Sequence, residues 1–224
     1  DATDRSRRLD AGDEAPGFIM DELEPGFQIE QIIGIWVAGQ SSIQTDPGLA
    51  YYLPAGSDLV ARIHYKKTWL DEGLSVEDRT AVGIHFSEAS DLTPIKSLAV
   101  GVSGATDTTS GMFVNYDQMI NESIELLSLI PEIDSSPLFV QLEAILPTGE
   151  RTPIVRLAQP RPAWRTRHWL KEPIQLPAGT RLNVSAIYPS IFAAENMSSL
   201  RFNMDVVPET QFNLVQNNHV LAAR

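Results

Sequence analysis

Two acidic residues separated by one position, Glu132 and Asp134, are the first candidates for chemistry in this sequence. They follow an apolar run, and a β-strand would place residues i and i+2 on the same face. Paired carboxylates suit a hard cation such as Ca²⁺, but a calcium site needs about six oxygen ligands. The sequence contains no D-x-D-x-D-G loop to supply them. No nucleophile or phosphate-binding motif accompanies the pair, so the simpler interpretation is an acidic edge that faces solvent or a partner.

A single histidine, His64, is the second candidate, and the segment of residues 53–86 would position it. Residues 54–57 (PAGS) predict a turn, because proline fixes φ and glycine adopts conformations that other residues avoid. The alternation of apolar and polar residues from Leu59 to Ile63 predicts a strand, and residues 81–86 predict a second one. His64 belongs to the polar set, where its ring could reach solvent or a metal. One histidine does not hold a metal by itself, so a surface histidine is the simpler interpretation.

The charged loop between these two predicted strands is a candidate for protein binding. Two lysines, Lys66 and Lys67, precede Trp69 and Leu70, and acidic residues follow them. Exposed apolar residues rimmed by charge are typical of a protein–protein contact. We therefore expect these four residues to contribute to an interface.

The remaining pattern predicts short strands and few helices. Apolar runs bounded by Gly, Pro, Ser or Thr predict strands in residues 29–37, 95–102, 111–114, 123–130, 138–146, 152–157 and 200–207. The strict alternation of residues 138–146, followed by Pro-Thr-Gly-Glu, predicts a hairpin with residues 152–157. Residues 1–27 are polar and lack periodicity, so they predict an extended arm or covering loop.

A short internal repeat suggests two related β-units. LPAGTRLNVSAIY (residues 176–188) repeats LPAGSDLVARIHY (residues 53–65), with Ile187 in the place of His64. Together with 15 prolines and 14 glycines, the pattern predicts an all-β fold of two tandem antiparallel β-sandwich units of the jelly-roll kind. The expected division is an extended N-terminal arm at 1–28, a first, incomplete sandwich unit at 29–103 and a second sandwich unit at 104–224.

Composition narrows the classes of function. The net charge of −12 argues against nucleic acid as a partner, because phosphate contacts need clustered Lys and Arg. The absence of cysteine excludes disulfides, Cys–zinc sites and thiol catalysis. No apolar run approaches the ~18 residues of a membrane helix, so we expect no transmembrane segment.

Several segments, taken in order, resemble one known family. RRLDAGDEAPGF, WVAG, DPGLAYYLPAGSDLV, IHY and VGIHF are similar to segments of the copper type II, ascorbate-dependent monooxygenases, which include the peptidylglycine and dopamine hydroxylating enzymes and bacterial relatives. The resemblance covers about residues 5–190. WVAG has Ala where the family usually has Pro. The resemblance implies two tandem β-sandwiches and an extracytoplasmic, bacterial periplasmic location. In the family, a His-His pair of the first copper site lies upstream of the RRLD-like segment, before the position of Asp1.

The resemblance also implies copper ligands, which this sequence does not supply. His64 stands at the position of one ligand of the first copper, whereas Glu132 and Asp134 replace the two histidines that bind the second. Cu(I) prefers imidazole and thioether to carboxylate. The family's methionine ligand has no equivalent, because neither Met197 nor Met204 lies in its context. We therefore expect no copper and treat His64, Glu132 and Asp134 as vestigial positions.

The leading hypothesis is a non-catalytic, copper-free relative of these enzymes. A scaffold that has lost its metal ligands suits binding or structure. The chain would be a structural or accessory subunit of a larger extracytoplasmic protein complex, with no cofactor. A membrane-bound complex fits this hypothesis, and the chain would then dock onto it peripherally. One alternative is a fragment of a copper- and ascorbate-dependent monooxygenase. Another is a carbohydrate- or calcium-binding module, in which aromatic residues would form a sugar platform: Trp36, Tyr51, Tyr52, Tyr65, Trp69, Trp164 and Trp169.

Overall fold

The structure, a computed structural model, divides the chain into two units. It describes residues 2–12, 17–18, 32–77, 79–89, 91–103, 109–133, 135–161, 165–197 and 199–209. Asp1–Gln28 and Leu53–Ser90 form the first unit, here called the small unit. Ile29–Tyr52 and Asp91–Arg224 form the second, here called the sandwich unit.

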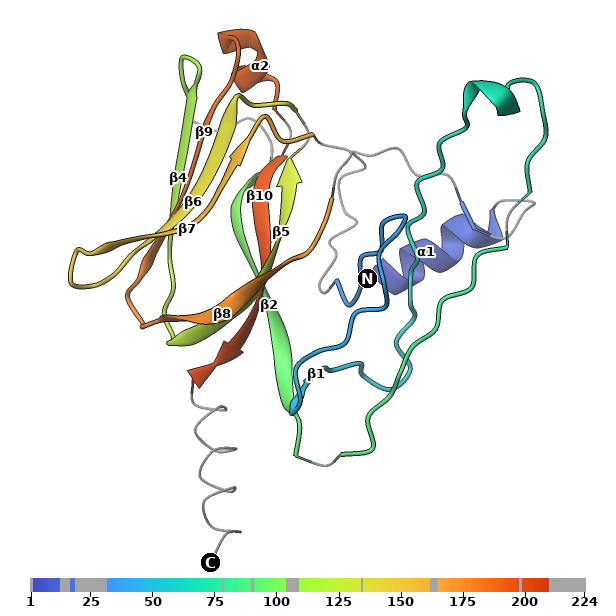
Figure 1. The fold of residues 1–224 in the computed structure, drawn as a ribbon, viewed down its shortest axis with the longest axis horizontal. Coiled ribbons are helices and arrows are strands. Elements are labelled where there is room, and N and C mark those ends of the chain that lie inside the picture. Colours follow the sequence, from blue (N-terminus) through green and yellow to red (C-terminus); the bar gives the residue numbers. More distant parts are fainter. Residues whose placement is uncertain are drawn as a thin grey trace, which may run out of the picture. The chain divides into compact units, whose positions relative to one another are not determined.

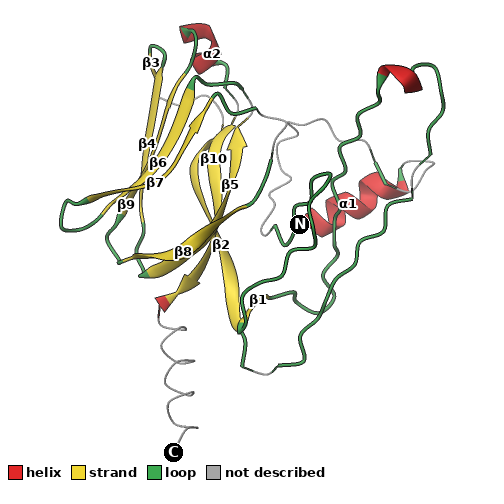
Figure 2. Ribbon diagram, viewed as in Figure 1, coloured by secondary structure: helices red, strands yellow, loops and turns green. Residues whose placement is uncertain are grey.

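The sandwich unit consists of two five-stranded sheets (Figures 1 and 2). One sheet has the strand order β1-β2-β10-β5-β8 and the other β3-β4-β9-β6-β7. Neighbouring strands are antiparallel, except that β1 runs parallel to β2. The strands are β1 (Leu49–Tyr51), β2 (Thr93–Ser103), β3 (Thr109–Ser110), β4 (Phe113–Met119), β5 (Ile124–Ile133), β6 (Phe139–Ile145), β7 (Arg151–Ala158), β8 (His168–Leu176), β9 (Arg181–Ile187) and β10 (Ser199–Pro208). The predicted all-β sandwich is confirmed.

Alternating apolar residues place the core between the two sheets. In β9, Leu182 and Val184 are fully buried, whereas Ser185 lies on the outward face. Phe202 and Met204 of β10 belong to the same buried cluster. Each such side chain stabilises the fold by about 1.5–3 kcal/mol relative to an exposed position. A single helix in the described part of this unit, α2 (Ile191–Glu195), lies between β9 and β10 in the sequence.

The predicted hairpin is present. Strands β6 and β7 pair directly, and the backbone N–H of Leu146 donates to the carbonyl of Glu150 at 2.8 Å. Gly149 has φ 88°, the left-handed conformation that glycine adopts readily. The predicted runs at 95–102, 123–130, 138–146, 152–157 and 200–207 correspond to β2, β5, β6, β7 and β10, and 111–114 overlaps the start of β4.

The two units do not follow the predicted domain boundaries. Strand β2, at the end of the first predicted sandwich, pairs along its length with β10 near the end of the second. The boundary between residues 103 and 104 therefore falls inside one sandwich, and the described residues contain one sandwich instead of two in tandem. Strand order in a Greek-key-like sandwich is non-local, so position along the chain does not reveal which strands share a sheet.

The small unit begins with a helix where the sequence predicted an extended arm. Helix α1 spans Ala2–Ala11, so the prediction is wrong for these residues. Asp4 lies in its first turn and Arg8 in its last, which are the favourable ends of the helix dipole for these charges. Arg7 also forms an ion pair with Asp58, with 2.7 Å between Nε and Oδ2. The dipole and this distant partner both favour the helix without a hydrophobic stripe.

Three predicted strands are absent. Residues 59–63, 81–86 and the described part of 29–37 (residues 32–37) contain no strand. In the described residues of 53–89, the one regular element is a 3₁₀ turn, η1 (Trp69–Asp71). A strand forms only when a neighbouring strand satisfies its N–H and C=O groups. Alternation in the sequence predicts the side-chain pattern of a strand but does not supply that neighbour.

Candidate functional site

The internal repeat provides a direct comparison between a segment that forms a strand and a similar segment that does not. We call residues 53–65 the first LPAG segment and residues 176–188 the second. Both begin with the same turn: Ser57 N–H donates to Pro54 O at 3.1 Å, and Thr180 N–H donates to Pro177 O at 3.1 Å. After the turn, the second segment becomes β9, hydrogen-bonded to β4 and β6. The first segment continues without a strand.

Burial separates the two segments as clearly as the backbone does. Leu59 is 49% exposed, whereas its equivalent Leu182 is 0% exposed. Tyr65 is 65% exposed, whereas its equivalent Tyr188 is 0% exposed. The sequence of the first segment is therefore suited to the middle of a sheet, while its surroundings in this chain are those of a surface.

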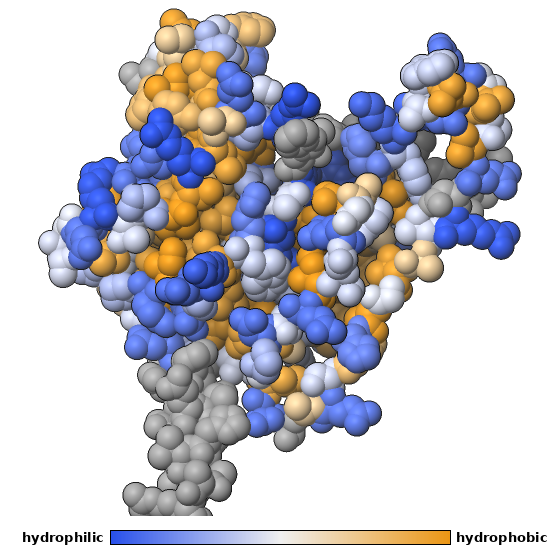
Figure 3. Space-filling view, in the orientation of Figure 1, coloured by the Kyte–Doolittle hydropathy of each residue, from blue (hydrophilic) through white to orange (hydrophobic). Residues whose placement is uncertain are grey.

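Large apolar side chains are exposed at intervals between residue 59 and residue 86, and we call the described part of this range the apolar segment. Figure 3 shows apolar and polar patches interspersed on the molecular surface. The large exposed apolar side chains of the apolar segment are Leu59, Val60, Ile63, Tyr65, Trp69, Leu70, Leu74, Val76, Val82, Ile84 and Phe86. Single exposed apolar residues are ordinary, but a concentration of them marks an interaction surface.

The predicted interaction residues lie in a turn with its own hydrogen bonds. Thr68 donates to Asp71 Oδ2 from its hydroxyl at 2.7 Å and from its backbone N–H at 3.2 Å. These hydrogen bonds lower the pKa of the Asp71 carboxyl. Lys67 Nζ donates to the carbonyl of Leu74 at 2.6 Å. The turn holds Trp69 and Leu70 outward, 80% and 66% exposed, as a docking residue requires.

Two of the residues predicted to be vestigial copper positions lie in different units. His64 is an exposed residue of the small unit, whereas Glu132 lies in β5 of the sandwich unit. Glu132 Oε2 accepts a hydrogen bond from Arg201 Nε at 3.0 Å and another from the same guanidinium. Asp134 lies outside the described residues. A carboxylate that is hydrogen-bonded to arginine does not fit a copper ion. In the described ranges, no three His, Asp or Glu side chains could share a metal.

A buried polar cluster in the sandwich unit escaped the sequence analysis. Arg167 Nε lies 2.8 Å from Asp205 Oδ2, and the two side chains are 1% and 3% exposed. Its N–H is not aligned for a hydrogen bond, so charge attraction dominates that contact. Ser128 and Tyr51 also donate hydroxyl hydrogens to Asp205 Oδ2, Tyr51 at 3.1 Å. Arg167 donates to the carbonyl of Ile32 and, at 3.4 Å, to that of Ile33.

This buried polar cluster stabilises the fold of the sandwich unit. The guanidinium of Arg167 lies 5.2 Å from the ring centroid of Tyr51 and 5.8 Å from that of Trp169. Burial, together with the Asp205 carboxylate, raises the pKa of Tyr51 far above its usual range, and Arg167 offsets part of this rise. Tyr51 therefore stays a neutral donor, and the cluster fastens residues 32–51 to β5, β8 and β10.

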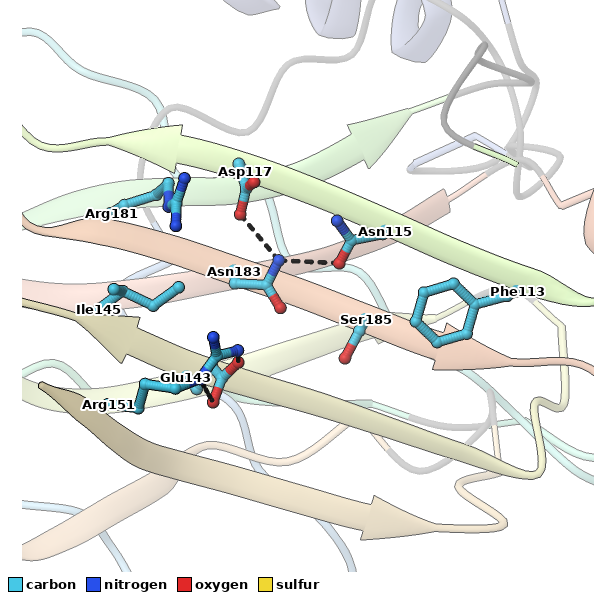
Figure 4. A pocket seen from close by; sticks show the side chains of 9 residues that line it. All are labelled: Phe113, Asn115, Asp117, Glu143, Ile145, Arg151, Arg181, Asn183 and Ser185. Carbon is cyan, nitrogen blue, oxygen red and sulfur yellow. Dashed lines mark hydrogen bonds and ion pairs between the residues drawn. The ribbon is translucent and has the colours of Figure 1, made fainter. Parts of the chain in front are cut away.

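A second group missed in the sequence lies on the outward face of β4 and β9. Asn115 and Asp117 occupy alternate positions of β4, and Asn183 and Ser185 occupy alternate positions of β9 (Figure 4). The sequence signal for this group was the polar residue at every second position of each strand, which places these side chains on one face. The pairing of β4 with β9, which brings them together, spans about a third of the chain and is not visible locally.

No helix in the described ranges is long and apolar enough to cross a membrane. No model of a known protein family matches the sequence, and no curated protein matches it. Among solved structures, the cycloisomaltooligosaccharide glucanotransferase of Paenibacillus sp., complexed with cycloisomaltoheptaose, is similar over 57% of this chain and 18% of its own, with 13% identity and a TM-score of 0.20.

Proposed function

We propose that this chain is a non-catalytic β-sandwich protein that acts as a structural or accessory subunit of a larger extracytoplasmic complex. The observation that carries the proposal is the contrast between the two LPAG segments. The same turn and the same alternation lead to a fully paired strand in one case and to an exposed apolar segment in the other. A partner protein that packs along residues 59–63 would cover the exposed apolar side chains of Leu59, Val60 and Ile63.

The loop beside the first LPAG segment supports the same partner surface. Trp69 and Leu70 are large, exposed and held outward by a turn that is already hydrogen-bonded. Aromatic anchors of this kind supply a large part of the binding energy in protein interfaces. The proposed extracytoplasmic, periplasmic location is supported by the resemblance to the copper monooxygenases. The proposed lack of copper is supported by the pairing of Glu132 with Arg201.

The double substitution Trp69→Ala/Leu70→Ala tests this proposal. The tagged full chain would be purified from its native source after treatment with an amine-reactive crosslinker. We expect Lys66 and Lys67 to crosslink to one partner, and we expect the double variant to recover at least about tenfold less of it, which corresponds to about 1.4 kcal/mol. Quantitative mass spectrometry of the purified complexes measures the recovery.

The matched control is Ile191→Ala/Phe192→Ala, which removes another exposed aliphatic–aromatic pair, from α2. This control is expected to recover the partner as the unchanged chain does. A chain that behaves as a monomer without a co-purifying protein contradicts the proposal, and so does equal loss in both double variants.

A further inference from the structure

The outward face of the sheet β3-β4-β9-β6-β7 carries a shallow depression of about 310 Å³ (Figure 4). It belongs to the sandwich unit and is independent of the apolar segment. Nine residues line it: Phe113, Asn115, Asp117, Glu143, Ile145, Arg151, Arg181, Asn183 and Ser185. Hydrogen-bonding side chains dominate this set.

The strand register sets these side chains in rows. Asn183 in β9 lies directly opposite Asp117 in β4 and Glu143 in β6. Ser185 lies opposite Asn115 in the next row. Directly opposed residues have Cβ atoms about 4.5–5.5 Å apart, so polar groups of three strands meet within reach of one small ligand. A sheet holds them more rigidly than a loop would.

Asn183 is the centre of the arrangement. Its amide nitrogen donates to Asn115 Oδ1 at 2.8 Å and to Asp117 Oδ1 at 2.7 Å, which uses both hydrogens and fixes the orientation of the group. The side chain is 8% exposed, yet its carbonyl oxygen accepts no hydrogen bond from the described residues. Figure 4 shows this oxygen on the side of the amide turned away from the two hydrogen bonds. The carbonyl oxygen of Asn183 is therefore held in place, is not among the buried polar atoms, and is open to a donor from outside the sheet.

The charges of the depression balance, which indicates a neutral ligand. Asp117 and Glu143 are opposed by Arg151 and Arg181, and Arg151 makes a two-point pair with Glu143, with 3.3 Å between Nε and Oε2. A cation would meet two guanidinium groups and an anion two carboxylates. The described residues contain no group of three acidic or histidine side chains that could hold a metal.

The uncharged polar groups of the depression, together with Asp117, can hydrogen-bond the hydroxyls of a sugar ring. Asn115 and Ser185 offer donors, and Asn183 and Asp117 offer acceptors, so neighbouring hydroxyls that both donate and accept can be satisfied together. Phe113, 42% exposed, stands at one end of the polar row, opposite the end with Arg181 and Ile145 (Figure 4). Its ring provides an apolar surface for the C–H face of a sugar.

We propose that this face of the sandwich binds a neutral oligosaccharide, with a sugar ring against Phe113 and hydroxyls on Asn115, Asp117, Asn183 and Ser185. The inference does not depend on the proposed docking function, because it concerns a different surface and a different class of ligand. The chain would then hold a glycan at the sandwich unit in addition to a protein at the apolar segment.

A titration of the ¹⁵N-labelled full chain followed by NMR tests the proposal, with neutral hexasaccharides of β-1,4-glucose, α-1,4-glucose, β-1,4-xylose and β-1,4-mannose as probes. We expect at least one probe to shift the amide signals of β4, β9 and β6 with saturation below about 10 mM. Phe113→Ala is expected to weaken that affinity by about tenfold or more, while Phe192→Ala, which removes an exposed ring outside the depression, leaves it unchanged.

The spectra of both variants also show whether they are folded. No shift with any probe, shifts confined to other surfaces, or an affinity that Phe113→Ala leaves unchanged overturns the inference. Shifts of this face by calcium chloride or sodium sulfate, in place of the sugars, overturn it as well and assign the depression to an ion.

Discussion

The substitution Arg167→Met is expected to lower the free energy of unfolding of the sandwich unit by about 3–5 kcal/mol. The reason is the burial of its partner: Asp205 is 3% exposed and would lose the one guanidinium beside it in the described structure. A buried carboxylate without a compensating charge is much more costly than the loss of the attraction itself. Urea unfolding followed by circular dichroism measures the change.

Two further variants distinguish the effect of burying the ion pair from the effect of losing its charge. Arg201→Met breaks a pair that is partly exposed, with Arg201 34% and Glu132 9% exposed, so about 1 kcal/mol is expected. Arg167→Met/Asp205→Asn removes both charges and leaves an amide oxygen for Ser128 and Tyr51, and it is expected to recover about half or more of the lost stability. An Arg167→Met variant as stable as the Arg201→Met variant would show that the cluster is not desolvated.

The substitution Gly101→Ala is expected to cost about 3 kcal/mol or more, one of the larger effects a single methyl group can have. Gly101 has φ 130° and lies opposite Arg201 where β2 meets β10. A Cβ atom there would lie 2.2 Å from the carbonyl oxygen of Leu200 and 2.6 Å from the Cα of Arg201. Because both are backbone atoms, the two strands must move apart. The midpoint of thermal unfolding is expected to fall accordingly.

The matched control is Gly83→Ala. A Cβ at Gly83 meets no atom within 4 Å, and its φ is not in the left-handed range. This variant is expected to unfold within about 0.5 kcal/mol of the unchanged chain. Equal stability of the two alanine variants would mean that β2 and β10 are not packed as closely as described.

The sequence predicted the elements whose causes are local. The strand pattern and turn of residues 138–157 led to the correct hairpin because alternation and the Pro-Thr-Gly-Glu turn act over a few residues. The same logic failed at residues 59–63, because the pattern of a strand does not reveal whether a neighbour exists. The helix at Ala2–Ala11 was missed since its support comes from charges at its ends and from Asp58, instead of from an apolar stripe.

The candidate sites show the same limit. The exposure of Trp69 and Leu70 could be predicted, because an aromatic and an aliphatic residue among charges are visible in the sequence. The pair Arg167–Asp205 could not be predicted, because Arg167 precedes β8, and β8 joins β10 only through β5. The row through Asn183 could not be predicted either, because Asn183 meets Asp117 and Glu143 only after distant strands pair. A polar residue in a strand pattern is equally compatible with a solvated face and with a site.

Hydrogen exchange of the two LPAG segments, measured by mass spectrometry on the isolated chain and on the complex from its native source, tests the central claim most directly. In the isolated chain, amides of residues 59–63 are expected to exchange at least about 100-fold faster than those of residues 182–186. In the complex, exchange at residues 59–63 is expected to slow toward that of the second segment. Protection of residues 59–63 in the isolated chain, or exchange that the complex leaves unchanged, would contradict the account.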